Sequence, residues 1–189
     1  MKNRIVLAYS GGLDTSVAIK WLSERYDSEI VTLTVDLGGA ELETARKRAL
    51  EIGAIKAVIK DARQEFIEEY VWPSLRAGAV YEGIYPLATA LGRPLIAKLL
   101  AEVAVEEGAM GVAHGCTGKG NDQIRFDVSI ATLAPSLQVF APAREWGMTR
   151  DQEISYAKER GIELDLNRRS PYSVDENLWG RSIEAGDLE

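Results

Sequence analysis

The predicted fold depends on one stretch, Ile5-Val6-Leu7-Ala8-Tyr9-Ser10-Gly11-Gly12-Leu13-Asp14-Thr15-Ser16. Its continuous apolar beginning is typical of a strand buried on both faces of a parallel sheet. Two adjacent glycines then let backbone amides turn toward a ligand, and the helical pattern that starts at Asp14 adds free N–H groups and a positive dipole end. Ser10, Thr15 and Ser16 would supply hydroxyl donors, and Asp14 could hold a metal ion. The stretch predicts a polyphosphate-binding loop or, alternatively, an ordinary strand–turn–helix corner capped by Asp14.

Strand-like and helix-like segments alternate along the rest of the chain. We expect strands at 4–9, 30–35, 55–59, 109–113 and 137–141, and helices at 14–25, 41–52, 62–77, 94–107, after 122, and at 149–160. This alternation predicts the α/β class, with a five-stranded, mostly parallel sheet and helices on both faces.

Three local patterns make finer predictions. Thr149-Arg-Asp-Gln152 matches a capping box at the start of the last helix. Residues 78–94 contain three glycines, two tyrosines and two prolines without periodicity, which predicts a long functional loop. In the helix after residue 122, we expect Ile124, Val128 and Leu133 to face the core.

The composition is that of an ordinary globular protein. The chain has 189 residues, 46% of them hydrophobic and 27% charged, and a net charge of -7, which argues against a nucleic-acid-binding surface. Its single cysteine excludes an intrachain disulfide and fits a reducing compartment. The sequence has neither a secretory signal pattern nor an apolar stretch long enough to span a membrane. We therefore expect a cytoplasmic protein without membrane or nucleic-acid partners.

Several other nucleotide and catalytic motifs do not match. Gly118-Lys119 is followed by Gly120, so the Walker A pattern fails, and a third glycine for a dinucleotide fingerprint is missing. His114 has no metal-ligand partner at a helical or ribbon spacing, so a zinc site is disfavoured. Cys116 could point the same way as His114, as thiol catalysis would require, but a small residue filling a tight loop is the simpler interpretation.

Polar and glycine-rich clusters follow the strands, at residues 10–16, 36–39 and 115–122, with Arg144-Glu145 after the fifth strand. Because parallel sheets bind ligands outside the carboxyl ends of their strands, we expect these clusters to converge on one edge. Their convergence predicts a nucleotide-type site.

The motifs resemble one known family. Ser10 to Ser16 is similar to the pyrophosphate-binding loop of the ATP pyrophosphatase (PP-loop) families, whose fold is adenine nucleotide alpha-hydrolase-like, and the whole chain from residue 4 resembles the argininosuccinate synthase family. The matching segments are Ala8 to Ser16, Tyr81-Glu82-Gly83, Arg93-Pro94-Leu95-Ile96-Ala97-Lys98, His114-Gly115, Thr117-Gly118-Lys119-Gly120-Asn121-Asp122-Gln123, Arg125-Phe126, Arg144-Glu145-Trp146, Ser173 and Asp175-Glu176-Asn177-Leu178.

The resemblance implies a ligase of arginine biosynthesis and the urea cycle. Such an enzyme joins citrulline and aspartate through a citrullyl-adenylate and releases AMP and pyrophosphate, with ATP and Mg²⁺ as cofactors. The family is homo-oligomeric, a homotetramer at full length, and carries a second domain. We therefore expect an ATP-binding domain at 1–165 and, at 166–189, a tail leading toward a second domain that this chain lacks. An isolated ATP-binding module without complete ligase activity is the alternative, whereas the net charge and single cysteine oppose a tRNA-modifying adenylase.

The resemblance also implies the roles of individual residues. Asp14 and Ser10 would be catalytic, and Asp14 would hold the metal. The ATP-binding residues would be Ala8, Tyr9, Ser10, Gly11, Gly12, Leu13, Asp14, Thr15, Ser16, Val35 and Gly115. Aspartate would be bound by Thr117, Asn121 and Asp122, and citrulline by Tyr85, Asn121, Arg125, Ser173 and Ser182.

Structural alternatives stay open for these residues. Thr117 and Asn121 could only cap the following helix, Arg125 could be a surface residue, and Tyr85 could fill the core. Ser173 and Ser182 lie in a polar tail. The chain also departs from the family pattern at three positions: Ala90 replaces a serine that contacts citrulline, whose hydrogen bond Thr89 could take over, and Val35 and Cys116 each replace an alanine.

Overall fold

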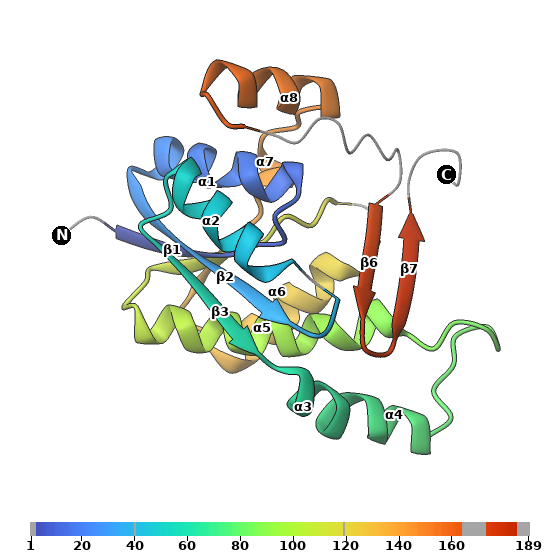
Figure 1. The fold of residues 1–189 in the computed structure, drawn as a ribbon. Coiled ribbons are helices and arrows are strands. Elements are labelled where there is room, and N and C mark those ends of the chain that lie inside the picture. Colours follow the sequence, from blue (N-terminus) through green and yellow to red (C-terminus); the bar gives the residue numbers. More distant parts are fainter. Residues whose placement is uncertain (1–2, 40, 119, 164–172, 185–189) are drawn as a thin grey trace.

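The fold is built on one fully parallel sheet. A computed structural model describes residues 3–39, 41–118, 120–163 and 173–184, without the side chains of Ser173 and Glu184. The sheet has five strands in the order β3-β2-β1-β4-β5 (Figure 1), and every neighbouring pair is parallel. The strands are β1 (Asn3–Ala8), β2 (Ser28–Asp36), β3 (Lys56–Asp61), β4 (Gly111–Ala113) and β5 (Gln138–Phe140). The expected class and sheet are confirmed.

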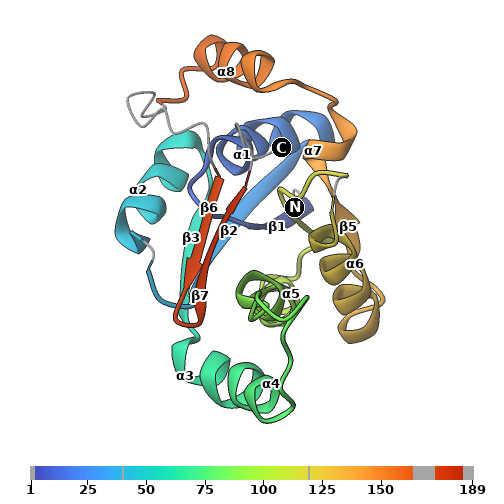
Figure 2. The same cartoon turned by 90° about the vertical axis from the view of Figure 1, so that its right-hand side faces the viewer.

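Helices cover both faces of this sheet (Figure 2), as expected. One apolar cluster packs α1, α2 and α8 against side chains such as Ile5 and Leu7 of β1, and the other packs α5 and α6 against the opposite face, where Val6 and Val31 point. The helices are α1 (Leu13–Tyr26), α2 (Leu42–Ile52), α3 (Arg63–Glu65), the π-helix η1 (Phe66–Val71), α4 (Trp72–Arg76), α5 (Ala88–Glu106), α6 (Asp122–Leu133), α7 (Pro142–Glu145) and α8 (Arg150–Glu159). None of the helices in the described ranges has the length and apolarity needed to cross a membrane.

The capping box at Thr149 is confirmed. The Thr149 side chain accepts a hydrogen bond from the backbone N–H of Gln152, and the Gln152 side chain accepts one from the N–H of Thr149. These reciprocal bonds satisfy two N–H groups that a helix start otherwise leaves unpaired.

Two sequence expectations about helices are wrong. Helix α5 begins at Ala88 rather than near residue 94, so Pro94 lies inside it and the loop is shorter than expected. Proline removes one interior helical hydrogen bond, but the residues around it are buried: Ala88 is 1% exposed, Leu95 is fully buried, and a Cβ on Gly92 would lie 2.9 Å from Leu37 Cδ1. Tertiary packing thus keeps this turn helical despite the proline.

The inward face of α6 also differs from the expectation. Ile124, Val128 and Leu133 are exposed, whereas Phe126 and Ile130 are buried. Both Ile124/Val128 and Phe126/Ile130 have the same four-residue spacing, so periodicity alone could not distinguish the two stripes. The ring of Phe126 stacks on that of buried His114, with centroids 5.0 Å apart, and this contact orients the helix.

The end of the described chain forms a hairpin that returns to the domain. Strands β6 (Ser173–Asn177) and β7 (Gly180–Glu184) are antiparallel. Figure 1 shows them beside the carboxyl ends of the central strands, where the Leu178 N–H donates to the carbonyl of Leu37 at 2.8 Å. The Trp179 indole N–H donates to Pro86 O at 2.7 Å, and the Asn177 amide donates to Ala88 O at 2.8 Å. The hairpin is therefore anchored both after β2 and at the start of α5.

Candidate functional site

The loop between β1 and α1 has the shape expected of an anion-binding turn. Gly11 has a φ of 79°, a conformation that favours glycine. A Cβ at Gly11 would lie 3.4 Å from that of Ala45 in α2, and Arg48 of the same helix donates to Gly11 O at 2.9 Å. Helix α2 therefore holds the loop from behind.

The start of α1 differs from a side-chain-capped corner. Gly12 is the N-cap and has no side chain to cap the helix, and Asp14 lies in the first turn rather than at the cap. The first N–H groups of a helix have no partner within it, so they are directed to a ligand or to water. Ser10 Oγ lies 3.2 Å from Thr15 Oγ1, and buried Ser16 bonds to the Tyr9 hydroxyl at 3.1 Å. This arrangement favours an anion site over the simple corner.

Asp14 has an acidic neighbour that the sequence analysis missed. Glu153 in α8 is only 6% exposed and lies close enough to Asp14 for the Asp14 charge to act on its carboxyl group. Burial and then the charge of Asp14 raise the pKa of Glu153 to about 8. Near pH 7 Glu153 therefore carries a proton. Glu153 is one of several polar residues of α8, so its spacing in the sequence did not predict that it would meet Asp14 of α1.

The second strand-end loop lies directly beside the first. Strands β1 and β4 are neighbours, but the helices that follow them, α1 and α6, cover opposite faces. Ligands bind in the crevice at such a switch point. A Cβ on Gly115 would lie 2.8 Å from Thr15 Cγ2, so the two loops approach each other closely.

Buried His114 shapes the second loop. Its Nδ1 accepts the Cys116 N–H at 3.2 Å, which leaves Nε2 to donate to Asp127 Oδ1 at 3.3 Å. Burial lowers the pKa of His114 below its ordinary value, so the ring is neutral at pH 7. Burial also raises the pKa of the Cys116 thiol to about 11. Such a thiol is a poor nucleophile, which favours the filler interpretation of Cys116.

The start of α6 carries a charged network. Asp122 accepts from Arg125 at Oδ1 and from Arg93 at Oδ2, both at 2.7 Å, and Arg93 also donates to Asp175 of β6 at 2.9 Å. Asn121 occupies the N-cap position, yet its side chain makes no capping hydrogen bond. The capping alternative thus fails for Asn121, while Arg125, whose side chain is 31% exposed, pairs with Asp122 of the same helix.

Tyr85 and Ser182 meet although they are far apart in the chain. The Tyr85 hydroxyl lies 3.0 Å from Ser182 Oγ, which lies 2.7 Å from Thr89 Oγ1. The Thr89 N–H also donates to the Tyr85 hydroxyl at 3.0 Å. Tyr85 is therefore part of a hydroxyl cluster rather than core filler.

The remaining candidate residues are located chiefly by their positions in the fold. Val35 lies near the end of β2 and packs against the α5 side of the core. Thr117 is exposed in the loop after β4. Ser173 opens β6, but its side chain lies outside the described residues. Asp36 forms a turn, accepting the Gly38 N–H at 2.8 Å, and pairs with Arg63 at 3.3 Å.

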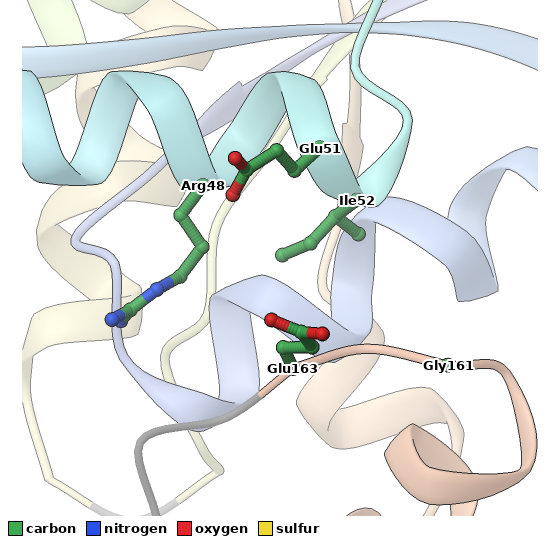
Figure 3. A pocket seen from close by; sticks show the side chains of 5 residues that line it. All are labelled: Arg48, Glu51, Ile52, Gly161 and Glu163. Atoms are coloured by element: carbon green, nitrogen blue, oxygen red, sulfur yellow. The ribbon is translucent and has the colours of Figure 1, made fainter.

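A cavity of about 240 Å³ lies elsewhere, between α2 and the chain that follows α8. It is lined by Arg48, Glu51, Ile52, Gly161 and Glu163 (Figure 3). In Figure 3 the guanidinium of Arg48 points toward the loop before α1, while Glu51 on α2 and Glu163 on the later segment lie on opposite sides of the cavity. The predicted substrate residues do not line this cavity, so the loops at the carboxyl ends of the strands remain the candidate site.

Comparison with known proteins identifies similar sequences. Residues 4–163 match the family described as "Arginosuccinate synthase N-terminal HUP domain". The chain is 56% identical over 190 residues to an argininosuccinate synthase of Dehalococcoides mccartyi strain BAV1, covering all of this chain and 47% of the relative. It is 58% identical over 189 residues to the Oceanobacillus iheyensis argininosuccinate synthase, covering all of this chain and 45% of that protein. The chain thus spans about half the length of these curated relatives.

More distant solved structures share the fold. An NH3-dependent NAD synthetase from Campylobacter jejuni has a TM-score of 0.52 at 11% identity, covering 88% of this chain and 67% of that one. A predicted tRNA methyltransferase subunit from Methanocaldococcus jannaschii has a TM-score of 0.51 at 15% identity, covering 83% and 76%. At these identities the likeness concerns the fold alone.

Proposed function

The chain belongs to the argininosuccinate synthase family, and from this membership we propose that it provides the adenylation site of an ATP-dependent ligase. The reaction would join citrulline and aspartate to argininosuccinate and release AMP and pyrophosphate. The observation that carries the proposal is the meeting of the β1 and β4 loops at the switch point of the sheet, where Gly115 abuts Thr15. Backbone amides for an anion and charged groups for amino acids would lie close together there.

ATP would lie along residues 8–16, with Val35 and Gly115 beside the nucleotide. The ureido oxygen of citrulline would attack the α-phosphate, and pyrophosphate would leave with most of the developing charge. Amides around Gly11 and Gly12, together with the hydroxyls of Ser10 and Thr15, would stabilise this charge.

Mg²⁺ would be held by Asp14 and by the phosphates of ATP. The residues fit this division of ligands, because Mg²⁺ in nucleotide sites is bound through one or two carboxylates plus phosphate oxygens. Within the described ranges no group of three or more histidine, cysteine or acidic side chains could form a cage of its own. When bound, the ion would neutralise charge on the phosphates.

The amino acids would occupy the side of the site near α5, α6 and the hairpin. Arg125 would clamp the citrulline carboxylate, with Asn121, Tyr85, Ser182 and Ser173 around the rest of citrulline. Because Thr89 bonds directly to Ser182, its hydroxyl can take over the role of the serine that Ala90 replaces.

Aspartate would be bound by Thr117, Asn121 and Asp122. The hydroxyl and the amide would contact its carboxylates, and Asp122 would accept from its ammonium group. The aspartate amine would then displace AMP from the adenylate, so the site would act chiefly by orienting the reactants.

The alternative is an ATP-binding module that needs further chain to complete the ligase. It is favoured by the length of the relatives, of which this chain covers less than half. Under both alternatives we propose a cytoplasmic, homo-oligomeric family member, in which residues 1–165 bind ATP and the rest leads toward a second domain.

An omission assay separates the alternatives. We would measure pyrophosphate release with ATP, Mg²⁺, citrulline and aspartate, and again without each amino acid, using Asp14→Ala as the inactive control. Release that requires both amino acids supports the ligase. ATP binding without citrulline-dependent exchange of pyrophosphate into ATP would leave only the binding module.

A further inference from the structure

Arg93 in α5 joins three elements that are distant in the sequence. Its Nε donates to Asp122 Oδ2 of α6 at 2.7 Å, and its Nη2 donates to Asp175 Oδ2 of β6 at 2.9 Å. The Arg93 side chain is 18% exposed, whereas those of Asp122 and Asp175 are 29% and 43% exposed, so the bond to Asp122 is the better shielded of the two. Burial lowers the pKa of Arg93, but the two carboxylates outweigh it and raise the pKa above its ordinary value.

Asp122 is held at both of its oxygens. Arg93 binds Oδ2 and Arg125 binds Oδ1, each at 2.7 Å. The carboxylate therefore cannot rotate without breaking a charge-assisted hydrogen bond, and its remaining lone pairs point in fixed directions. A fixed acceptor of this kind is suited to an ammonium group.

Asp175 belongs to the hairpin that supplies Ser182. The two residues are register partners in adjacent strands, and Ser182 bonds to Tyr85 and Thr89. The Arg93–Asp175 bond therefore fixes the strand beside the predicted citrulline residues, while the Arg93–Asp122 bond fixes the predicted aspartate residue. The guanidinium of Arg93 therefore contacts a residue of the predicted aspartate site and a residue of the hairpin that carries part of the predicted citrulline site.

We propose that Arg93 is a positioning residue that couples the β6–β7 hairpin to the Asp122 carboxylate, so that the two amino-acid sites are assembled together. The inference rests on the proposed function for the identity of the amino acids. It needs arginine, because the planar guanidinium serves two carboxylates through separate nitrogens, whereas a lysine ammonium is a single point charge.

The test compares Arg93→Gln, Arg93→Lys and Asp175→Asn with a matched control, Arg181→Gln. Arg181 pairs with Glu176 at 2.6 Å, but both residues lie within the hairpin, so the control removes a guanidinium without breaking a link to another element. Hydrogen exchange is measured first on the unliganded chain. Calorimetry then measures affinity for ATP, for citrulline with the non-cleavable analogue α,β-methylene-ATP bound, and for aspartate with this analogue and citrulline bound, so that no reaction occurs during the titration.

We expect Arg93→Gln to speed hydrogen exchange in residues 174–183 about tenfold and to weaken aspartate binding about tenfold, with ATP affinity changed less than about twofold. Asp175→Asn should loosen the hairpin and weaken citrulline binding while leaving Asp122 held. Arg93→Lys should restore only part of the aspartate affinity, and Arg181→Gln should resemble the wild type.

Two results would overturn the inference. Exchange in Arg93→Gln equal to that in Arg181→Gln would show that no coupling exists, and equal losses of ATP and aspartate affinity would reveal a general structural defect. If Arg93→Gln does not fold, Asp175→Asn decides: hairpin exchange equal to that in Arg181→Gln, or equal losses of ATP and citrulline affinity, would overturn the inference. A wild-type chain that binds neither amino acid would contradict the proposed function and would reject the role of Arg93 in aspartate binding. Hydrogen exchange in the unliganded chain would still decide whether Arg93 couples the hairpin to Asp122.

Discussion

Buried Glu153 in α8 lies beside Asp14 in the first turn of α1, and burial together with the Asp14 charge raises the pKa of Glu153 to about 8. The contact links the last helix of the domain to the candidate metal ligand. It also makes the stability of the metal-free protein depend on pH, because Glu153 has an ordinary pKa of 4.5 when this environment is lost.

Glu153→Gln should remove this pH dependence. Between pH 4.5 and about 8 the folded protein keeps a proton that the unfolded chain releases, so the wild type loses stability as the pH rises through this range. Glutamine keeps a neutral polar side chain beside Asp14 without titrating. Urea unfolding should give similar free energies at pH 5, and at pH 8 the variant should be more stable by about 3 kcal/mol. Parallel profiles for the two proteins would contradict the assignment.

Gly11→Ala should destabilise the fold by about 1–2 kcal/mol, because an alanine would be strained at a positive φ. The matched control is Gly12→Ala: Gly12 has a φ of −75°, and an added Cβ would lie 3.4 Å from Ser10 Oγ, which is ordinary contact. Denaturant unfolding compares the two variants. If both variants lose the same free energy of unfolding, the positive φ of residue 11 is not the reason that a glycine occupies this position.

Ser182→Ala should weaken citrulline binding without altering ATP binding. The substitution leaves the hydroxyls of Tyr85 and Thr89 without their shared partner, which costs about 1 kcal/mol in stability. Ser155→Ala, which removes a hydroxyl bonded to Asp151 O on an exposed helix surface, is the control. Calorimetry that finds unchanged citrulline affinity in Ser182→Ala would remove this residue from the site.

Arg125→Ala should weaken citrulline binding about tenfold or more, and aspartate binding as well, with little effect on ATP. The second effect follows because Arg125 holds Asp122 Oδ1 at 2.7 Å. Arg76→Ala, which changes an exposed arginine at the end of α4, controls for the loss of a positive charge. Equal losses for all three ligands would identify Arg125 as a structural residue.

The sequence predicted those parts of the fold that local chemistry determines. The buried strand, the glycine turn and the start of α1 follow from adjacent residues, and the Thr149 capping box is a four-residue pattern. The alternation of elements gave the parallel sheet. Family motifs placed Tyr85, Asp122, Arg125 and Ser182 together as substrate residues, and the structure brings Tyr85 to Ser182 and Asp122 to Arg125.

Long-range packing determined the parts that the sequence did not predict. Pro94 marked a helix start that burial of its neighbours overrides, and two equivalent stripes on α6 could be resolved only by the contact of Phe126 with His114. Glu153 and Arg93 act through partners in other elements. No spacing along one helix encodes such contacts, so their roles became visible only in three dimensions.

The loops at the carboxyl ends of the strands are proposed to bind ATP and citrulline together. Calorimetric titration of the chain with ATP and Mg²⁺, followed by citrulline, tests this claim most directly. We predict saturable ATP binding that Asp14→Ala weakens, and citrulline binding that requires bound nucleotide and is weakened by Ser182→Ala. ATP binding that is insensitive to Asp14→Ala, or citrulline affinity that is the same with and without nucleotide, would contradict the claim.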